Sequence, residues 1–187
     1  MTIDFPSLDS TVNGDDRSIS DQGLLDRTMR PYAGKGCVYL KDSSVDIVDA
    51  HVVGRGQFSI AEACYIEETG HFNAVEFNIS YNQLFYYTLA ACIRDSTLPE
   101  FSGWSLADYW PRQLPNILIH KMSSKYSKPI NSRNYFGEMT IMDIGFRNRS
   151  QPLIAVETRI QFSDDNGGQA SGDVSIVILD PPRAQDF

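Results

Sequence analysis

The sequence predicts an α+β fold in which a mostly antiparallel sheet curls around one long, buried helix. Two observations support this prediction. Residues 82–94 are apolar on nearly every side and contain neither Gly nor Pro, as expected of a helix that is buried all round. From residue 117 onward, the chain alternates strand-like segments with turn residues. A helix that is apolar all round requires a sheet that surrounds it.

The N-terminal part of the chain changes character near residue 20. Residues 1–20 are polar and rich in Ser and Asp, which predicts a mobile tail. Residues 21–187 are expected to form a single domain, because this length can bury a good core. A short helix is expected over residues 22–29, since Pro31 disfavours its continuation.

Two strands are expected next, over residues 45–53 and 56–60. The Gly-Arg-Gly sequence at residues 54–56 is interpreted as a turn or bulge between them. Residues 75–81 alternate apolar and polar side chains, which is the period of a strand with one buried face. The central helix is therefore expected to begin only at residue 82.

An irregular aromatic segment is expected over residues 101–115, after the central helix. Turn residues at 164–168 separate the last two of the strands that close the chain. These closing strands are predicted over residues 117–126, 135–146, 153–162 and 170–179.

Composition excludes several classes of protein. The net charge of −8 argues against nucleic acid as the main partner. No apolar run approaches the roughly 20 residues that span a bilayer, and the first residues lack a signal pattern, so a cytoplasmic protein is expected. The 3 cysteines lack metal-type spacing and predict neither a metal site nor a disulfide framework.

The most informative stretch is Gly-His-Phe-Asn-Ala-Val-Glu at residues 70–76. It places an imidazole, an amide and a carboxylate where the predicted strand meets the predicted helix. Polar groups buried at a helix end are costly unless they are paired, which makes them candidates for a functional site. The plainer interpretations are a structural histidine at His71, a turn residue at Asn73 and a helix N-cap at Asn82.

Several motifs, in this order and spacing, resemble the FcoT-type family. The longer ones are residues 70–76, Asn-Gln-Leu at 82–84, Ser-Ser-Lys-Tyr-Ser-Lys-Pro at 123–129 and Asp-Asn-Gly-Gly-Gln-Ala-Ser-Gly at 165–172. Shorter ones are Pro-Tyr at 31–32, Lys-Gly-Cys at 35–37 and Ala-Cys-Tyr-Ile at 63–66. The resemblance covers about residues 22–180.

The resemblance implies a hot-dog fold and chemistry on acyl thioesters. Some members are described as long-chain fatty acyl-CoA thioesterases. Others, in isonitrile lipopeptide pathways, are described as adding glycine to the β-carbon of a (2E)-enoyl group on an acyl carrier protein and releasing the 3-[(carboxymethyl)amino] fatty acid. The implied partners are glycine, a fatty acyl thioester and an acidic carrier protein. Its phosphopantetheine brings the acyl chain, and no metal or other cofactor is expected.

Catalytic chemistry favours glycine addition over plain hydrolysis. Many hot-dog thioesterases use a carboxylate on the central helix, but the helix predicted over residues 82–94 has none, and Glu76 lies before it. Glu76 would contribute only if the backbone turned it inward. Plain thioesterase activity is the alternative. A non-catalytic acyl-binding protein is less favoured, because it would gain nothing from burying these polar groups.

Conjugate addition needs a proton relay and donors for the enolate oxygen. His71, Tyr65, Asn73 and Asn82 supply suitable groups. Family members are thought to use tyrosines at the motif positions of Tyr65 and Tyr32, although either tyrosine suits an ordinary core position.

Positive charge is concentrated late in the chain. Between residues 108 and 138 there is no acidic residue, and the basic ones are Arg112, Lys121, Lys125, Lys128 and Arg133. This strip is either a solvated strand face or a surface that attracts an acidic carrier or the phosphate of coenzyme A. Lys35 and Lys128 are the candidates for binding the glycine carboxylate. A homodimer or dimer of dimers is expected, because hot-dog domains commonly pair.

Overall fold

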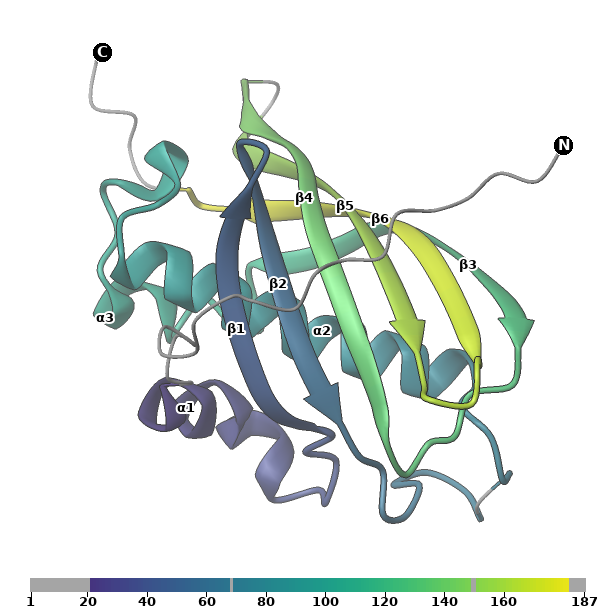
Figure 1. Cartoon of the computed structure of the whole chain (residues 1–187). Helices are drawn as coiled ribbons and strands as arrows, with labels where there is room; N and C mark the ends of the chain where they lie inside the picture. The colour runs from purple at the N-terminus through teal and green to yellow at the C-terminus, as the bar shows by residue number, and fades with distance from the viewer. Residues whose placement is uncertain (1–20, 68, 149–150, 182–187) are drawn as a thin grey trace, which may run out of the picture.

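The structure, a computed structural model, describes residues 21–67, 69–148 and 151–181. One antiparallel sheet with the strand order β1-β2-β4-β5-β6-β3 curves around the helix α2 (Figure 1). The elements are α1 (Gln22–Ala33), β1 (Leu40–Val48), β2 (His51–Phe58), α2 (Ala74–Arg94), the 3-10 turn η1 (Pro99–Phe101), α3 (Leu106–Tyr109), β3 (Ile117–Lys128), β4 (Tyr135–Asn148), β5 (Pro152–Ser163) and β6 (Gln169–Leu179). This arrangement confirms the predicted α+β, hot-dog fold. The predicted mobile tail lies outside the described residues.

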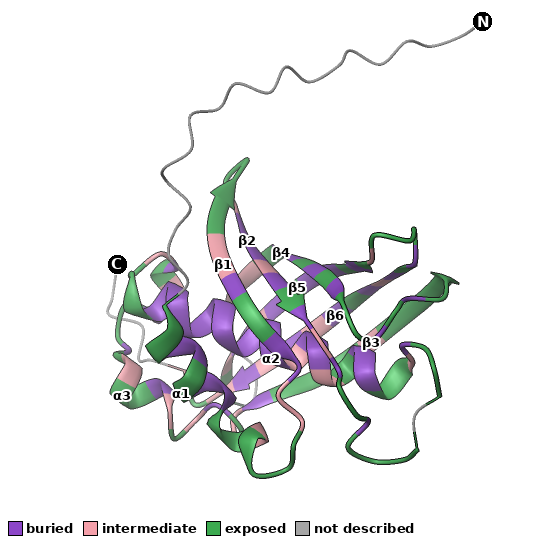
Figure 2. Cartoon of the chain, turned by 60° about the horizontal axis from the view of Figure 1, so that its bottom comes forward, coloured by how far each residue is buried: buried purple, intermediate pink, exposed green. Residues whose placement is uncertain are grey.

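The core lies between α2 and the concave face of the sheet. Figure 2 shows α2 buried over most of its length, as expected for a helix that is apolar on nearly every side. The helix α1 packs against α2, and an ion pair of 2.6 Å joins Asp21 to Arg94, near the C-terminal end of α2. Among the described residues, no helix combines the length and the apolar character that a membrane crossing requires.

The strands β3 to β6 match the predicted ranges to within two residues at each end. The predicted start of α1 at residue 22 is correct, but the predicted end at residue 29 is too early. The helix passes Pro31 and continues to Ala33, because Pro31 lies in the last turn and removes only one intrahelical N–H donor there.

The prediction of a strand over residues 75–81 is wrong, because α2 begins at Ala74. Alternation over seven residues cannot distinguish a strand from a helix whose environment is apolar on most sides. The informative signal was Asn73 followed three residues later by Glu76, which is the spacing of a capping box.

The turn predicted at residues 54–56 is also wrong. β1 and β2 are joined by Asp49 and Ala50, both with positive φ (49° and 65°), in a two-residue hairpin loop of the kind that normally contains Gly or Asn. Gly54 instead lies within β2, where a Cβ atom would collide with Oγ1 of Thr88 on α2. The glycine is needed for the close approach of the sheet to the helix.

We expect Gly54→Ala to lower the free energy of unfolding by about 1–3 kcal/mol, because the added methyl group overpacks a filled core. Urea denaturation measures this loss. Gly34→Ala is the matched control, since no atom lies within 4 Å of its added Cβ and its φ is −69°. Thr88→Ala in the Gly54→Ala background should restore stability, and failure of this rescue would contradict the proposed collision.

Candidate functional site

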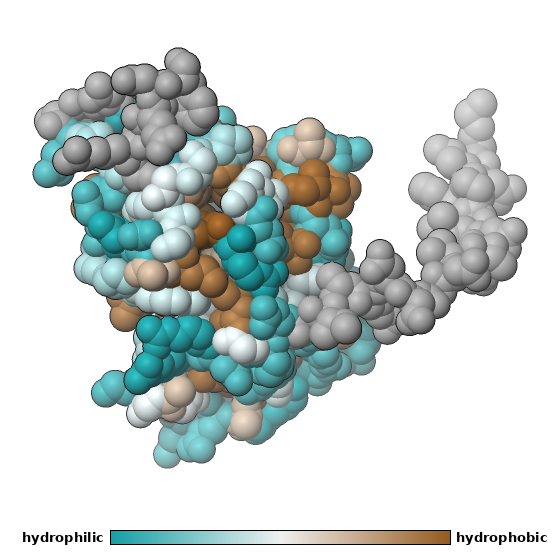
Figure 3. Space-filling model, turned by 90° about the vertical axis from the view of Figure 1, so that its left-hand side faces the viewer, coloured by the Kyte–Doolittle hydropathy of each residue, from teal (hydrophilic) through white to brown (hydrophobic). Residues whose placement is uncertain are grey.

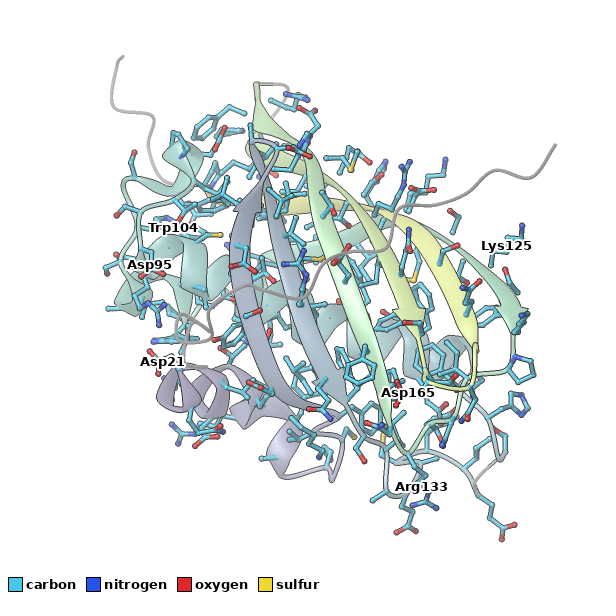
Figure 4. All side chains as sticks on the ribbon, viewed as in Figure 1. Asp21, Asp95, Trp104, Lys125, Arg133 and Asp165 are labelled. Atoms are coloured by element: carbon cyan, nitrogen blue, oxygen red, sulfur yellow. The ribbon has the colours of Figure 1, made fainter. Side chains whose placement is uncertain are left out.

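A hollow of about 330 Å³ lies at the N-terminal end of α2, beside the end of the edge strand β3. Two of the sequence motifs meet there. The motif at residues 70–76 contributes His71, Phe72, Asn73 and Ala74 to the lining. The motif at residues 123–129 contributes Tyr126, Ser127, Lys128 and Pro129, and the next residue, Ile130, completes it. Figure 4 places Lys125 at this end of the molecule and Trp104 at the opposite end.

A capping box holds the first turn of α2 in place beside the hollow. Oδ1 of Asn73 accepts hydrogen bonds from the backbone N–H groups of Val75 (2.9 Å) and Glu76 (3.4 Å). In return, Oε2 of Glu76 accepts from the backbone N–H of Asn73 at 3.0 Å. The positive end of the α2 dipole therefore lies at the hollow and favours negative charge there.

The amide group of Asn73 also orients Tyr65. Its Nδ2 atom donates to the hydroxyl oxygen of Tyr65 at 2.5 Å. Because Asn73 is the donor, the Tyr65 hydroxyl keeps its own hydrogen for another acceptor. The side chain of Tyr65 is 37% exposed, so a substrate oxygen can reach it. The geometry of this pair suits hydrogen bonding to a substrate oxygen that develops negative charge.

The imidazole of His71 is exposed at the rim of the hollow. Its Nδ1 atom lies 3.1 Å from the carbonyl oxygen of Thr69, and Oγ1 of Thr69 donates to the His71 carbonyl at 2.9 Å. A carbonyl oxygen can only accept, so in this contact Nδ1 carries the hydrogen and Nε2 is the basic nitrogen. This tautomer suits a group that takes and returns a proton.

The opposite wall of the hollow comes from the end of β3. The backbone N–H of Phe72 donates to the carbonyl of Ile130 at 3.2 Å, which joins the two walls. Lys128 is exposed here and adds positive charge to that of the helix end. Tyr126 was not singled out from the sequence, although it lies inside a motif; its ring packs edge-on against Phe77 at 5.9 Å.

Glu76 does not lie before the central helix, as the sequence interpretation assumed. It is in the first turn of α2 and only 3% exposed, so the central helix does carry a carboxylate. It is not among the residues that line the hollow, and its Oε2 atom is bonded to the backbone of Asn73. This geometry makes Glu76 a support for Asn73.

Asn82 is not the N-cap of α2. It lies within the helix, nine residues after Asn73 and so about 13 Å further along the axis. Its Nδ2 atom donates to Oδ1 of Asn78 at 2.9 Å. Together with Val75 and Ile79, these two asparagines form a partly exposed stripe on α2 that the sheet does not cover.

Tyr32 lies at the end of α1 and does not line the hollow in this chain. It packs against the core, and Tyr86, Cys37 and Tyr109 are among the titratable groups around it. Burial raises the pKa of Tyr32 well above its ordinary value, so the hydroxyl remains protonated and can act only as a hydrogen-bond donor or acceptor.

The remaining predicted cations are all exposed. Lys35 lies in the connection between α1 and β1, outside the hollow, and its carbonyl accepts a hydrogen bond from the Cys37 thiol at 3.3 Å. Lys121 and Lys125 lie on β3, the strand that ends at Lys128. Of the predicted site residues, His71, Asn73 and Lys128 line the hollow. Tyr65 and Glu76 do not line it, but each forms a hydrogen bond with Asn73.

A second hollow is lined by none of the predicted site residues. This larger hollow, of about 510 Å³, lies on the outer face of the sheet around Arg55, whose guanidinium already pairs with Asp46 and Glu138 at 2.8 Å each. The end of the molecule with α1 and α3 mixes hydrophilic and hydrophobic residues (Figure 3). Within the described residues, no three His, Cys, Asp or Glu side chains are grouped as metal ligands.

Comparison with known families gives a match over most of the chain. The model of the FcoT-like thioesterase domain matches residues 27–178. A protein from Mycobacterium marinum (strain ATCC BAA-535 / M), named (2E)-enoyl-[ACP] glycyltransferase, is 37% identical over 86% of this chain and 88% of its own. A protein of the same name from Streptomyces coeruleorubidus is 34% identical over 88% of this chain and 100% of its own.

Comparison with solved structures supports the fold. A mutant thioesterase from Pseudomonas aeruginosa has a TM-score of 0.52 and 10% identity, and the match covers 88% of this chain and 97% of that one. A putative thioesterase from Shewanella oneidensis has a TM-score of 0.50 and 11% identity, with coverage of 84% and 98%. At such low identity, the likeness concerns the hot-dog fold alone.

Proposed function

The chain belongs to the FcoT-like thioesterase family, and from this premise we propose that it adds glycine to a (2E)-enoyl thioester on an acyl carrier protein. Glycine attacks the β-carbon, and hydrolysis of the thioester then releases a 3-[(carboxymethyl)amino] fatty acid in the cytoplasm. The observation that carries the proposal is the convergence of His71, Lys128 and the Tyr65–Asn73 pair at one end of α2. The shared name of the relatives supports the same reaction.

The addition step matches the chemistry of the hollow. As the amine nitrogen bonds to the β-carbon, the electrons of the double bond move toward the thioester, and negative charge develops on its oxygen. The hydroxyl of Tyr65, held by Asn73, donates to that oxygen. Nε2 of His71 takes the proton that the amine loses and delivers a proton to the α-carbon, so the step consumes no external acid.

The second step uses the same oxyanion donor. Water adds to the thioester carbonyl, the oxygen again becomes negative, and the carrier leaves as a free thiol. Tyr65 stabilises both charged states because the reacting carbonyl need not move between the steps. The proposed reaction uses no cofactor besides the phosphopantetheine that arrives on the carrier.

Simple hydrolysis of a long-chain acyl-CoA is the second candidate. The name of the family model, a thioesterase domain, favours hydrolysis of a thioester. The carboxylate of Glu76 is now placed on the central helix, as such a mechanism requires. Its bond to the Asn73 backbone and its position behind the hollow weigh against a direct attack on substrate.

Mass spectrometry with isotope-labelled glycine distinguishes the two candidates. The purified protein is incubated with a short (2E)-enoyl carrier protein, and the matched saturated acyl carrier serves as control. We expect the label in the released acid from the enoyl substrate only. Rapid hydrolysis of saturated acyl-CoA, with no incorporation of glycine, would establish the thioesterase and refute the addition.

Substitutions of lysines separate binding of glycine from binding of the carrier. We expect Lys128→Ala to raise the KM for glycine on the order of tenfold, because a charged hydrogen bond to the carboxylate is lost. Lys121→Ala and Lys125→Ala should instead raise the KM for the carrier, through weaker attraction of its acidic surface. Steady-state kinetics with each substrate varied in turn measure the two KM values. An unchanged KM for glycine in Lys128→Ala would exclude this lysine as a ligand of the glycine carboxylate.

We also propose that two copies pair along β3. This strand is at the edge of the sheet, twelve residues long, and most of its side chains are exposed. Leu118 (43% exposed) and Ile119 (36%) are apolar residues on that edge. An unpaired edge of this kind invites a second strand, and a second copy could also cover the stripe on α2 that contains Asn82.

Light scattering tests the pairing. We expect the native protein to be a dimer or a dimer of dimers at micromolar concentration, and Leu118→Asp to shift it toward the monomer. Leu114→Asp is the matched control, because Leu114 is also exposed (51%) but lies before the strand. A monomeric native protein, or an equal effect of both variants, would refute pairing along β3.

A further inference from the structure

Two cysteines that the proposed reaction does not use lie next to each other. The Tyr39 hydroxyl donates to Sγ of Cys64 at 3.3 Å. The thiol of Cys37 donates to the Lys35 carbonyl at 3.3 Å and is also within hydrogen-bonding reach of the Cys64 thiol. Segments that are 27 positions apart in the sequence therefore meet at a pair of thiols (Cys37 and Cys64).

The two thiols differ in anchoring and in exposure. The carbonyl of Cys37 accepts a hydrogen bond from Nε2 of Gln83 at 2.5 Å, and Oε1 of Gln83 accepts from the backbone N–H groups of Tyr39 and Leu40 at 2.9 Å each. Cys37 is thus tied to α2 and half-buried. Cys64 is exposed, in the connection between β2 and α2.

The chemical environment sets the order in which the thiols react. Burial, and then the hydrogen bond with Cys64, raise the pKa of Cys37 to about 11, so this group is a thiol near neutral pH. Oxidation is expected to begin at the exposed Cys64, and Cys37 is placed to resolve it. Cys92 is buried in α2, where burial raises its pKa to about 12, and is too enclosed to take part.

We propose that Cys37 and Cys64 are a redox modification site that forms a reversible intramolecular disulfide. The oxidant is a peroxide. The Cys64 sulfur attacks hydrogen peroxide and becomes a sulfenic acid as water leaves. The Cys37 sulfur then attacks that sulfur, an S–S bond forms, and a second water leaves. Two thiols are oxidised and one peroxide is reduced, and a dithiol reagent reverses the change.

The disulfide acts on the candidate site through Tyr65, the neighbour of Cys64 in sequence. To form the bond, the Cys64 sulfur must move from hydrogen-bonding distance to about 2.05 Å from that of Cys37. This movement breaks its contact with the Tyr39 hydroxyl and draws Tyr65 away from Asn73. Oxidation therefore lowers turnover. This consequence rests on the proposed function, whereas formation of the disulfide does not.

Thiol counting and mass spectrometry of the full chain test the disulfide directly. After treatment with hydrogen peroxide and unfolding, we expect one free thiol in place of 3, a mass lower by two hydrogen atoms, and recovery with dithiothreitol. Peptide mapping should show Cys37 linked to Cys64. Cys92→Ser should still form the bond, whereas Cys37→Ser and Cys64→Ser should not.

Three outcomes would contradict the proposed disulfide between Cys37 and Cys64. They are a cross-link between two chains on a non-reducing gel, oxidation of Cys64 without a link to Cys37, and equal thiol loss in Cys37→Ser and the native protein.

In the activity assay, peroxide should lower turnover about tenfold in the native protein and in Cys92→Ser, but not in Cys37→Ser. A disulfide with unchanged turnover refutes the effect on catalysis. Failure of the reduced protein to add glycine refutes the proposed function alone.

Discussion

His71→Ala and Tyr65→Phe should each lower turnover on the order of 10²-fold, which is the usual scale for a general acid–base group and for an oxyanion donor. His71→Ala removes the nitrogen that moves the proton. Tyr65→Phe keeps the ring but leaves the amide of Asn73 without its acceptor and the substrate oxygen without its donor. Both side chains are exposed, so their free energies of unfolding should change little.

Steady-state kinetics with the enoyl carrier and glycine measure the loss. His120→Ala is the matched control, because this histidine is also exposed but lies on β3 and does not line the hollow. Under reducing conditions, Cys64→Ser should keep most of the activity, since the reaction needs no thiolate. A folded but inactive Cys64→Ser, together with an active His71→Ala, would point to covalent thiol catalysis in place of this mechanism.

Phe162→Ala should lower the free energy of unfolding by about 3–5 kcal/mol, the usual cost of removing a buried ring. Phe162 is 1% exposed and packs against four other rings. The centroid distances are 5.7 Å to Phe58, 5.1 Å to Phe72, 5.0 Å to Phe77 and 5.9 Å to Tyr135. Activity should fall as well, because Phe72 lies between His71 and Asn73 in the wall of the hollow.

Urea denaturation of Phe162→Ala and of Phe146→Ala provides the comparison. Phe146 lies on β4 and is 37% exposed, so its loss should cost much less. Phe162→Leu, which keeps more of the apolar volume, should recover part of the stability. Equal losses of unfolding free energy for Phe162→Ala and Phe146→Ala would show that the packing of Phe162 against its four neighbouring rings does not stabilise the fold.

The start of α2 determines the structural roles of several residues in the candidate site. The motif at residues 70–76 is evident in the sequence alone, because polar groups stand beside an apolar helix. The plainer interpretations, Asn73 as a turn residue and Asn82 as the N-cap, are both wrong. Once α2 begins at Ala74, the cap moves to Asn73, and Glu76 becomes a residue of the central helix. One error in a helix boundary changed three assignments.

The remaining members of the site depend on contacts between distant segments. Tyr126 and Lys128 reach the hollow because β3 ends beside the start of α2, and Phe72 bonds there to Ile130. No local spacing contains that information. For the same reason, the sequence could not show that Tyr32 packs against the core, outside the hollow, or that Cys37 meets Cys64.

The sequence by itself determined the fold class, the four C-terminal strands and the motifs of the site, because these follow from periodicity and residue type. The capping-box spacing of Asn73 and Glu76 also marks the start of α2 in the sequence, against the misleading alternation of residues 75–81. Only the tertiary structure decided the position of the hairpin at Asp49 and Ala50. Apolar surroundings on most sides remove the periodic signal of a helix. A close approach such as that of Gly54 to Thr88 turns an apparent turn residue into a packing requirement. Both effects arise from what the folded chain places around a residue.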